Sequence, residues 1–396
     1  ILLMQIAFHA SDVPLAEEAL LAYWELPREE QAHLAKQFAF LHQYLTYLQE
    51  LTSTPKQPPS EFNIQNWLEW LQLIEADPDN PALLASLDRL TAITDERSWD
   101  LEKIKLLCDK LLGFIINSHS ASYRYTKTAL QRIADFFLKE EDFPRDENAY
   151  TELYETLYLG LLEIGEINQR TGFALLRLAE AILRQSPLVC ERISKNFFDW
   201  CKTPIPSLEN WVLEAFELLA EYGLAPSLLA MWYREWVSYL LSLPGNRERS
   251  NLETWMLFGE WIQPGRDLLL KVQQALTDVV QGTIDDPIAT LVGGYRIGIF
   301  SLRASSAQRA KQLLLARNAT LDVRICIEKD LSEQAKALAQ NSDLAVIVTT
   351  CITHALTYGI GPYLKKEPVY PQASGSTSIV RAIETHISYV KSKALR

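Results

Sequence analysis

The stretch LAVIVTT at residues 344–350 is the strongest strand signal in this chain of 396 residues, because it is uncharged and rich in β-branched side chains. Such residues favour strands, and a strand that is apolar on both faces is typical of a parallel sheet covered by helices on each side. Two similar runs precede it, RIGIFS at 296–301 and DVRICI at 322–327. Segments with helical spacing separate the three runs, so the pattern predicts a parallel sheet with right-handed crossovers.

The same alternation continues to the end of the chain. The other elements expected are helices at 305–317, 332–341, 353–364 and 377–391 and a short strand at 368–370. Together with the three strands they predict a small Rossmann-like α/β domain.

The chain before residue 283 has a different periodicity. Apolar residues recur there every three or four positions, which places them on one face of a helix. Gly223 and Pro226 mark the end of one such helix and the start of the next, since glycine suits a helix C-terminus and proline suits the first turn. All ten tryptophans precede residue 283 and are expected mostly in the core.

The two patterns predict a multidomain fold of class α + α/β. A large all-α region, an irregular helical bundle or solenoid-like array, is followed by a small Rossmann-like domain with a parallel sheet. The Pro-rich stretch 54–60 and the segment TIDDPIATLVGG supply the boundaries. The predicted domains are an N-terminal helical hairpin at 1–54, a helical domain at 61–282, a linker at 283–294 and the Rossmann-like domain at 295–396.

Charge is distributed unevenly between these parts. The whole chain carries 38 Lys+Arg and 50 Asp+Glu, a net charge of −12. Residues 295–396 hold 14 basic and 7 acidic residues, a net +7, so residues 1–294 carry −19. The basic part is suited to an anionic partner. The other interpretation, that the two parts attract each other across an interface, stays open at this point.

The carboxyl ends of the predicted strands hold the candidate binding residues. Ligands of open parallel sheets lie beyond these ends, and helix N-termini with Ser or Thr hydroxyls favour anions. The sequence therefore predicts that this domain binds an anionic ligand, a nucleotide or a phosphate. The alternative is that these residues are ordinary helix N-caps. The candidates are Ser301, Arg303, Ser305, Ser306, Thr349, Thr350, Thr353, His354, Ser374, Gly375, Ser376, Ser378 and Arg381.

Catalytic motifs give little support to an enzyme. No GxGxxG follows a strand, and GxxxxGK[ST], HExxH and GxSxG are missing. Cys351 and His354 lie three residues apart at a strand-to-helix turn and are the candidate catalytic residues. An enzyme acting on a phosphorylated or nucleotide substrate, with His354 as acid or base, is therefore kept as an alternative. No cofactor and no metal site are expected.

The segment 342–384 resembles a small bacterial family of Rossmann-like domains without an established activity. The resemblance rests on the pattern T-x-x-x-[ST]-H, here at 349–354, and on G-x-x-S at 375–378. It implies that Thr349, Thr353, His354, Gly375 and Ser378 lie near a shared pocket. The overall plan also resembles prokaryotic conflict-system proteins that join a Rossmann-like nucleotide sensor to a helical domain, which implies antiviral defence. Residues 1–294 resemble no family that we recognise.

The leading hypothesis is a non-catalytic interaction protein of a bacterial antiviral complex. Its acidic helical region would bind other protein subunits, and its C-terminal domain would bind an anionic small molecule. A purely structural subunit close to nucleic acid is a further alternative. No membrane partner is expected, because no uncharged run of about 18 apolar residues occurs. Five widely spaced cysteines without a CxxC suggest a reducing cytoplasm.

Overall fold

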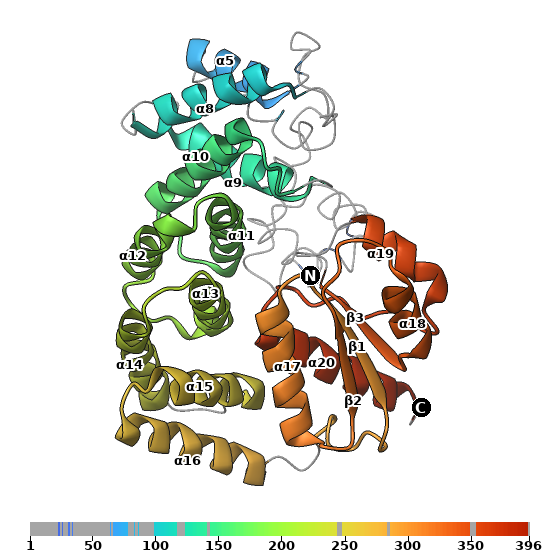
Figure 1. The fold of residues 1–396 in the computed structure, drawn as a ribbon. Coiled ribbons are helices and arrows are strands. Elements are labelled where there is room, and N and C mark those ends of the chain that lie inside the picture. Colours follow the sequence, from blue (N-terminus) through green and yellow to red (C-terminus); the bar gives the residue numbers. More distant parts are fainter. Residues whose placement is uncertain are drawn as a thin grey trace. The chain divides into compact units, whose positions relative to one another are not determined.

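The structure is a computed structural model, shown as a ribbon in Figure 1. It describes residues 64, 66–77, 99–116, 123–140, 143–243, 248–282, 286–348 and 354–394, together with Tyr23, Leu26, Gln31, Leu34, Leu83 and Ser86. The chain divides into two compact units, Ile1–Ile93 and Thr94–Arg396. No helix among these residues is both long and apolar enough to cross a membrane.

In the first unit the structure describes one complete helix, α5 (Trp67–Ala76). Asn66 caps it, since its side chain accepts a hydrogen bond from the Glu69 amide at 3.0 Å. Trp67 and Trp70 are fully buried, and the Trp70 indole donates to the Leu83 carbonyl at 2.8 Å. The helical spacing expected for this stretch is thus confirmed.

The second unit begins with an array of helices in which each helix packs on others close to it in the sequence (Figure 1). We call this part the array. Its helices are α8 (Leu101–Ile116), α9 (Tyr123–Leu138), α10 (Asn148–Ile164), α11 (Gln169–Gln185), α12 (Cys190–Trp200), α13 (Glu209–Glu221), α14 (Pro226–Ser242), α15 (Arg249–Ile262) and α16 (Arg266–Gly282).

The ends of these helices follow local sequence signals. The Asn168 side chain accepts from the Thr171 amide at 2.9 Å and caps α11. After α13 the chain turns at Gly223, whose φ of 81° lies in the left-handed region, and Pro226 starts α14. The helix end at Gly223 and the start at Pro226 are therefore confirmed.

Aromatic side chains fill the centre of the array. The rings of Trp200 and Phe197 meet Trp211 edge to face, with centroids 5.0 and 5.3 Å apart. The Trp211 indole donates to the Gly172 carbonyl of α11 at 2.6 Å, so its polar atom is satisfied inside the core. Trp261 departs from the expectation, since about half of it (52%) is exposed. Eight of the ten tryptophans are buried core residues: Trp67, Trp70, Trp99, Trp200, Trp211, Trp232, Trp236 and Trp255.

The last part of the second unit is a three-stranded parallel sheet with helices on both faces, which we call the α/β unit. Its strands have the order β2-β1-β3. Val346 and Ile347 of the last strand pair with Ile299 and Phe300 of the first. The elements are β1 (Arg296–Phe300), α17 (Ala304–Arg317), β2 (Asp322–Cys326), α18 (Glu333–Asn341), β3 (Leu344–Ile347), α19 (His354–Ile360) and α20 (Ser376–Ala394).

Two apolar layers hold the helices on this sheet. Ile297 and Ile299 of β1 pack with α17 and α20 on one face. Phe300 and Cys326 pack with α18 and α19 on the other face. The alternation follows from the period of two along a strand, and it confirms a parallel sheet with apolar strands after a helical region.

One expected strand is wrong. Residues 368–370 form only a single parallel bridge, between Val369 and Val346. The Val369 amide donates to Ala345 at 2.8 Å, but Pro368 has no amide hydrogen and Pro371 follows closely. Two prolines in four residues therefore prevent a continuous ladder.

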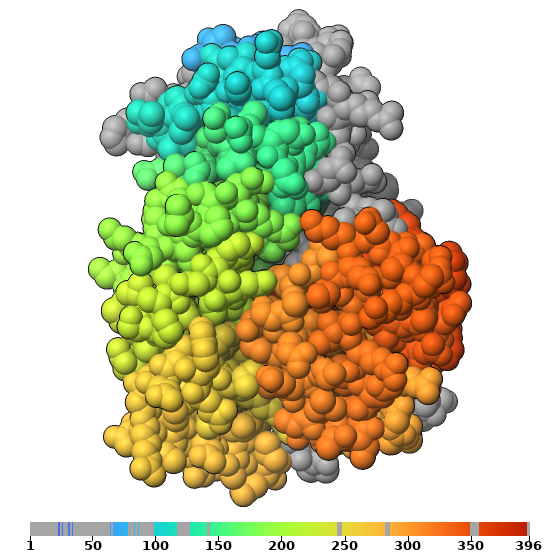
Figure 2. All heavy atoms as spheres, viewed as in Figure 1, coloured from blue at the N-terminus to red at the C-terminus, as the bar shows by residue number. Residues whose placement is uncertain are grey.

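The α/β unit packs directly against the array. Helices α17 and α20 contact α15, and α20 also contacts α13. Figure 1 shows α17 between the sheet and the array and α20 behind the strands, and Figure 2 shows the two sets of atoms in contact. The contact brings the acidic array and the basic α/β unit together, and the polar residues along it form the candidate site.

Candidate functional site

The carboxyl end of β1 and the start of α20 form a serine-lined rim. We define the rim as Ser301, Arg303, Ser305, Ser306 and residues 374–378. Ser301 is fully buried, and its hydroxyl accepts from the Arg303 amide at 3.1 Å. This bond holds the turn from β1 into α17, so that Arg303 leads directly into the helix.

A carboxylate of the array occupies the rim. The Ser376 amide, at the first residue of α20, donates to both oxygens of Glu217 at 2.9 and 3.0 Å. The Ser376 hydroxyl donates to the same carboxylate. Unpaired amides and the helix dipole make a helix N-terminus favourable for an anion. Glu217 comes from α13, 159 residues earlier in the chain.

Two arginines of the α/β unit add positive charge around this carboxylate. Arg309 pairs with Glu217 at 3.2 Å. Arg303 pairs with Glu221 at 3.0 Å and donates to the Ser374 hydroxyl at 2.6 Å. The Ser305 hydroxyl also donates to Glu221, at 3.1 Å.

Glu214 is the third carboxylate of α13 at the rim. It is almost fully buried, and its carboxyl group lies directly against the backbone of Gly375. A Cβ atom at position 375 would lie 2.4 Å from both Glu214 oxygens. Among the described residues, Glu214 Oε1 and Ser306 Oγ are buried without a partner of hydrogen-bond geometry, although Ser306 faces Glu217. These two buried polar atoms lie beside the charged contacts between α13 and the rim.

The surroundings move the pKa values of the two buried glutamates in opposite directions. Burial and the nearby charge of Glu217 raise the pKa of Glu214 to about 7. Burial alone would raise the pKa of Glu217, but the positive charges of Arg309 and Arg303 outweigh it and lower that pKa below its ordinary value. Glu217 is therefore the charged member of the pair, and Glu214 is neutral in part of the molecules near pH 7.

Replacing Glu214 with glutamine should change how stability depends on pH. Because the pKa of Glu214 is raised on folding, the folded state binds more protons than the unfolded state between about pH 4.5 and 7, and the free energy of unfolding falls as pH rises through that window. E214Q removes this fall and should be more stable than the wild type by about 1–2 kcal/mol near pH 8. Urea denaturation at a series of pH values measures this difference in the free energy of unfolding, with a substitution at an exposed position, Glu235→Gln, as control. Parallel pH profiles of wild type and E214Q would contradict the assignment.

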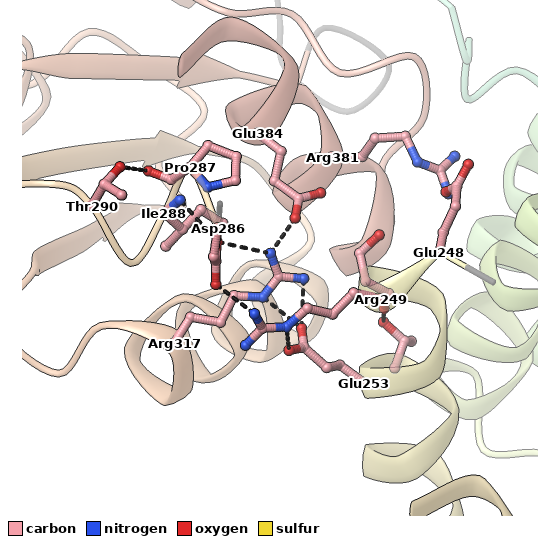
Figure 3. A network of polar contacts seen from close by, with 12 residues as sticks. Glu248, Arg249, Glu253, Asp286, Pro287, Ile288, Thr290, Arg317, Arg381 and Glu384 are labelled. Carbon is pink, nitrogen blue, oxygen red and sulfur yellow. Dashed lines mark hydrogen bonds and ion pairs between the residues drawn. The ribbon is translucent and has the colours of Figure 1, made fainter. Parts of the chain in front are cut away.

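A second polar cluster joins the two parts farther along α17 and α20 (Figure 3). Its centre is Arg317, whose side chain is 1% exposed and pairs with Glu253 of α15 at 2.7 Å. Arg317 also bonds to Glu384 of α20 and lies 3.8 Å from Asp286. Arg249 also pairs with two of these acids, Asp286 at 2.6 Å and Glu253 at 2.7 Å. We call these five residues the clamp.

Arg381 lies apart from the rim, about one turn along α20 from Ser378. It bonds to the side chains of Asn210 and Asn251 at 2.7 and 2.8 Å and pairs with Glu248 (Figure 3). Its guanidinium therefore also faces the array.

The structure gathers most of the predicted binding residues that it describes. Eight of them belong to the rim, and apart from Ser301 they lie around the three α13 glutamates: Arg303, Ser305, Ser306, Ser374, Gly375, Ser376 and Ser378. Ser301 supports the turn beneath them. Thr349, Thr350, Cys351 and Thr353 lie outside the described residues, and so does the side chain of His354.

The acidic half of the site was not among the residues predicted from the sequence. Glu214, Glu217 and Glu221 follow one another at three and four residues, which places them along one face of α13. This line of carboxylates on an otherwise apolar helix was a signal for a buried partner. Arg309 was missed as well, because it lies one turn after the loop that was considered.

The arrangement is suited to binding an oxyanion. The Ser376 amide, the Ser376 hydroxyl and the Arg309 guanidinium bind one carboxylate, and such donors are strongest toward charged acceptors. Among the described residues, no group of three or more His, Cys, Asp or Glu side chains could hold a metal ion.

Comparison with known proteins gives one match. A family model described as DpdD-like matches residues 1–382. No curated protein and no solved structure matched the chain. The matched range covers the array, for which the sequence suggested no family, and most of the α/β unit. The resemblance of 342–384 to a separate small family stays a prediction. The chain belongs to the DpdD-like family, a family tied to phage defence.

Proposed function

We propose that this chain is a non-catalytic interaction protein of a phage-defence complex, with a Rossmann-like α/β unit that recognises an anionic group at its rim. The array serves as the scaffold that holds this unit and contacts other subunits. A nucleotide or another phosphate-bearing molecule is the ligand class that we propose, and the cytoplasm is the proposed location.

The observation that carries this proposal is the geometry around Glu217. The Ser376 amide donates to both carboxylate oxygens while the Ser376 hydroxyl and Arg309 bind the same group. The rim therefore has the donors that an oxyanion needs, at the carboxyl end of the sheet where ligands of such folds bind. The strand order β2-β1-β3 with helices on both faces supports the Rossmann-like assignment.

The array also has features of a protein-binding surface. It is the acidic part of the chain, and it exposes Trp261, Met231 and Leu188. Tryptophan and methionine are enriched in protein interfaces. These side chains support the proposal that other subunits bind there.

A purely structural role is the second candidate, and a specific observation favours it. Glu217 and Glu221 already bind donors of the rim. In a purely structural role, these bonds would do no more than hold the α/β unit on the array. The two candidates differ in whether an external anion is bound.

Calorimetry and thermal-shift measurements with mono-, di- and cyclic oligonucleotides distinguish the anion-binding role from the purely structural role. We expect at least one of these to bind and to raise the melting temperature, with Arg309→Met weakening the response because it removes a charge at the rim. A wild type and an Arg309→Met variant that respond equally would place the binding elsewhere. The enzyme alternative predicts turnover that His354→Ala abolishes, whereas a binding role predicts no turnover in either protein.

A further inference from the structure

We propose that Glu217 is an internal ligand of the rim, so that an external oxyanion binds only by displacing it and thereby breaks the contact between α13 and α20. This inference rests on the anion-binding role proposed above and adds its regulation. The array would then keep the site closed until a phosphate-bearing molecule competes successfully with the glutamate.

The first step is that the donors and the acceptor come from different parts of the chain. The Ser376 amide and hydroxyl and the Arg309 guanidinium all belong to the α/β unit, whereas Glu217 belongs to the array. The anion site is therefore complete on the α/β unit alone. Removing the glutamate leaves a site with its donors already in place.

The second step is that no external anion can share the site with Glu217. The Glu217 side chain is 1% exposed, and both its oxygens are bound by the Ser376 amide. A second anion at the same amide would face this buried charge without water to screen it. Competition is thus required by the geometry.

The third step concerns the class of ligand. An amide, a hydroxyl and a guanidinium around one group suit a carboxylate or a phosphate, and arginine favours phosphate because its planar donors match the oxygens. The buried hydroxyl of Ser306 faces the same carboxylate, and Arg303, which is bound to Glu221 and Ser374, adds a second positive charge close by. A terminal phosphate therefore fits this donor set better than a neutral group.

The fourth step links occupancy to the interface. Glu217 is the middle one of the three α13 glutamates that contact the rim, between Glu214 at Gly375 and Glu221 at Arg303. Moving it out of the rim removes the bonds between α13 and the first residue of α20, whereas the bond from Arg381 to Asn210 lies outside the rim. The clamp around Arg317 uses α15 and does not involve the rim, so it keeps the α/β unit attached while the rim opens.

The experiment is chemical rescue of a variant that lacks the internal ligand. Glu217→Ala and wild type are titrated with inorganic phosphate and with acetate, and the melting temperature and the dissociation constant are measured. We expect Glu217→Ala to be destabilised without anions and to recover with phosphate. Its dissociation constant should be at least about tenfold lower than that of the wild type, because the rim is no longer occupied internally. Glu235→Ala, on the exposed side of α14, is the matched control and should behave as wild type.

Amide hydrogen exchange reports the opening. In the wild type, phosphate at saturating concentration should increase exchange in α13, whereas in Glu217→Ala it should decrease exchange at the start of α20. If Glu217→Ala fails to fold, Glu217→Gln keeps the shape of the side chain without its charge and is expected to show the same tighter phosphate binding.

The outcomes separate this inference from the proposed function. Equal phosphate binding by wild type and both variants would show that Glu217 does not compete, and it would overturn the inference while leaving anion binding intact. Phosphate binding by the wild type without faster exchange in α13 would also overturn it. No response of Glu217→Ala or Glu217→Gln to any anion would overturn both.

Discussion

Replacing Arg317 with methionine should lower the free energy of unfolding by about 3–5 kcal/mol, because it removes the buried cation at the centre of a network of acids. The guanidinium is 1% exposed and bonds to Glu253 and Glu384, with Asp286 3.8 Å away. In the variant Arg249 still pairs with Glu253 and Asp286, whereas Glu384 loses its ion pair with Arg317. Methionine fills a similar volume, so the loss reports charge rather than a cavity.

Urea denaturation of the full chain measures this effect, with Arg324→Met as the matched control. Arg324 has a side chain that is 69% exposed and pairs with Asp322 two residues away on the same strand. An exposed pair of this kind contributes about 0–1 kcal/mol. Equal losses from the two substitutions would show that the clamp does not hold the α/β unit on the array.

Replacing Gly375 with alanine should destabilise the protein by about 3 kcal/mol, at the upper end of the usual cost of overpacking. The added Cβ would lie 2.4 Å from both carboxylate oxygens of Glu214, which is almost fully buried. Gly375 precedes the first residue of α20, and its carbonyl accepts the first helical bond from the Ile379 amide. Alanine is less favourable than glycine at such an N-cap, by up to about 1 kcal/mol. The φ of Gly375 does not lie in the left-handed region, so the larger part of the cost comes from the contact with the array.

Denaturation curves of wild type and Gly375→Ala give this value. Gly361→Ala is a suitable control, since a Cβ there would meet no atom within 4 Å. The control should change the free energy of unfolding by less than about 1 kcal/mol. An equal loss of unfolding free energy in the control and in Gly375→Ala would contradict the close contact between Gly375 and Glu214.

The fold could largely be predicted from local patterns. The spacing of apolar residues fixed the position of α14, and Gly223 and Pro226 fixed the turn before it. Short apolar runs identified β1 and β3, because a strand buried on both faces needs apolar side chains on both. The strand expected at 368–370 was wrong, because Pro368 has no amide hydrogen to donate and only the single bridge at Val369 forms.

Only the rim of the candidate site could be predicted from the sequence, and the glutamates that bind to it could not. The rim follows from the rule that parallel strands point their carboxyl ends to one edge, and this rule identified Ser376 and Arg303. The occupant comes from a helix 159 residues away, and no local pattern relates Glu217 to Ser376. The charge difference between the two parts indicated attraction but not which residues meet.

The split of charge now has a structural explanation. The positive charges of Arg303 and Arg309 meet glutamates of α13, and Arg317 meets Glu253 of α15. The interpretation in which the two parts attract each other is thus supported by specific ion pairs. The proposed binding of an external anion is compatible with this attraction, because the internal glutamate and the external anion would use the same donors at different times.

The measurement that tests the contact between α13 and the rim most directly is the cost of Gly375→Ala in two backgrounds. In the wild type we predict about 3 kcal/mol, and in a Glu214→Ala chain, where the obstructing carboxylate is gone, less than about 1 kcal/mol. The same cost in both backgrounds would show that Glu214 does not lie against Gly375, and it would contradict the packing of the acidic helix on the rim.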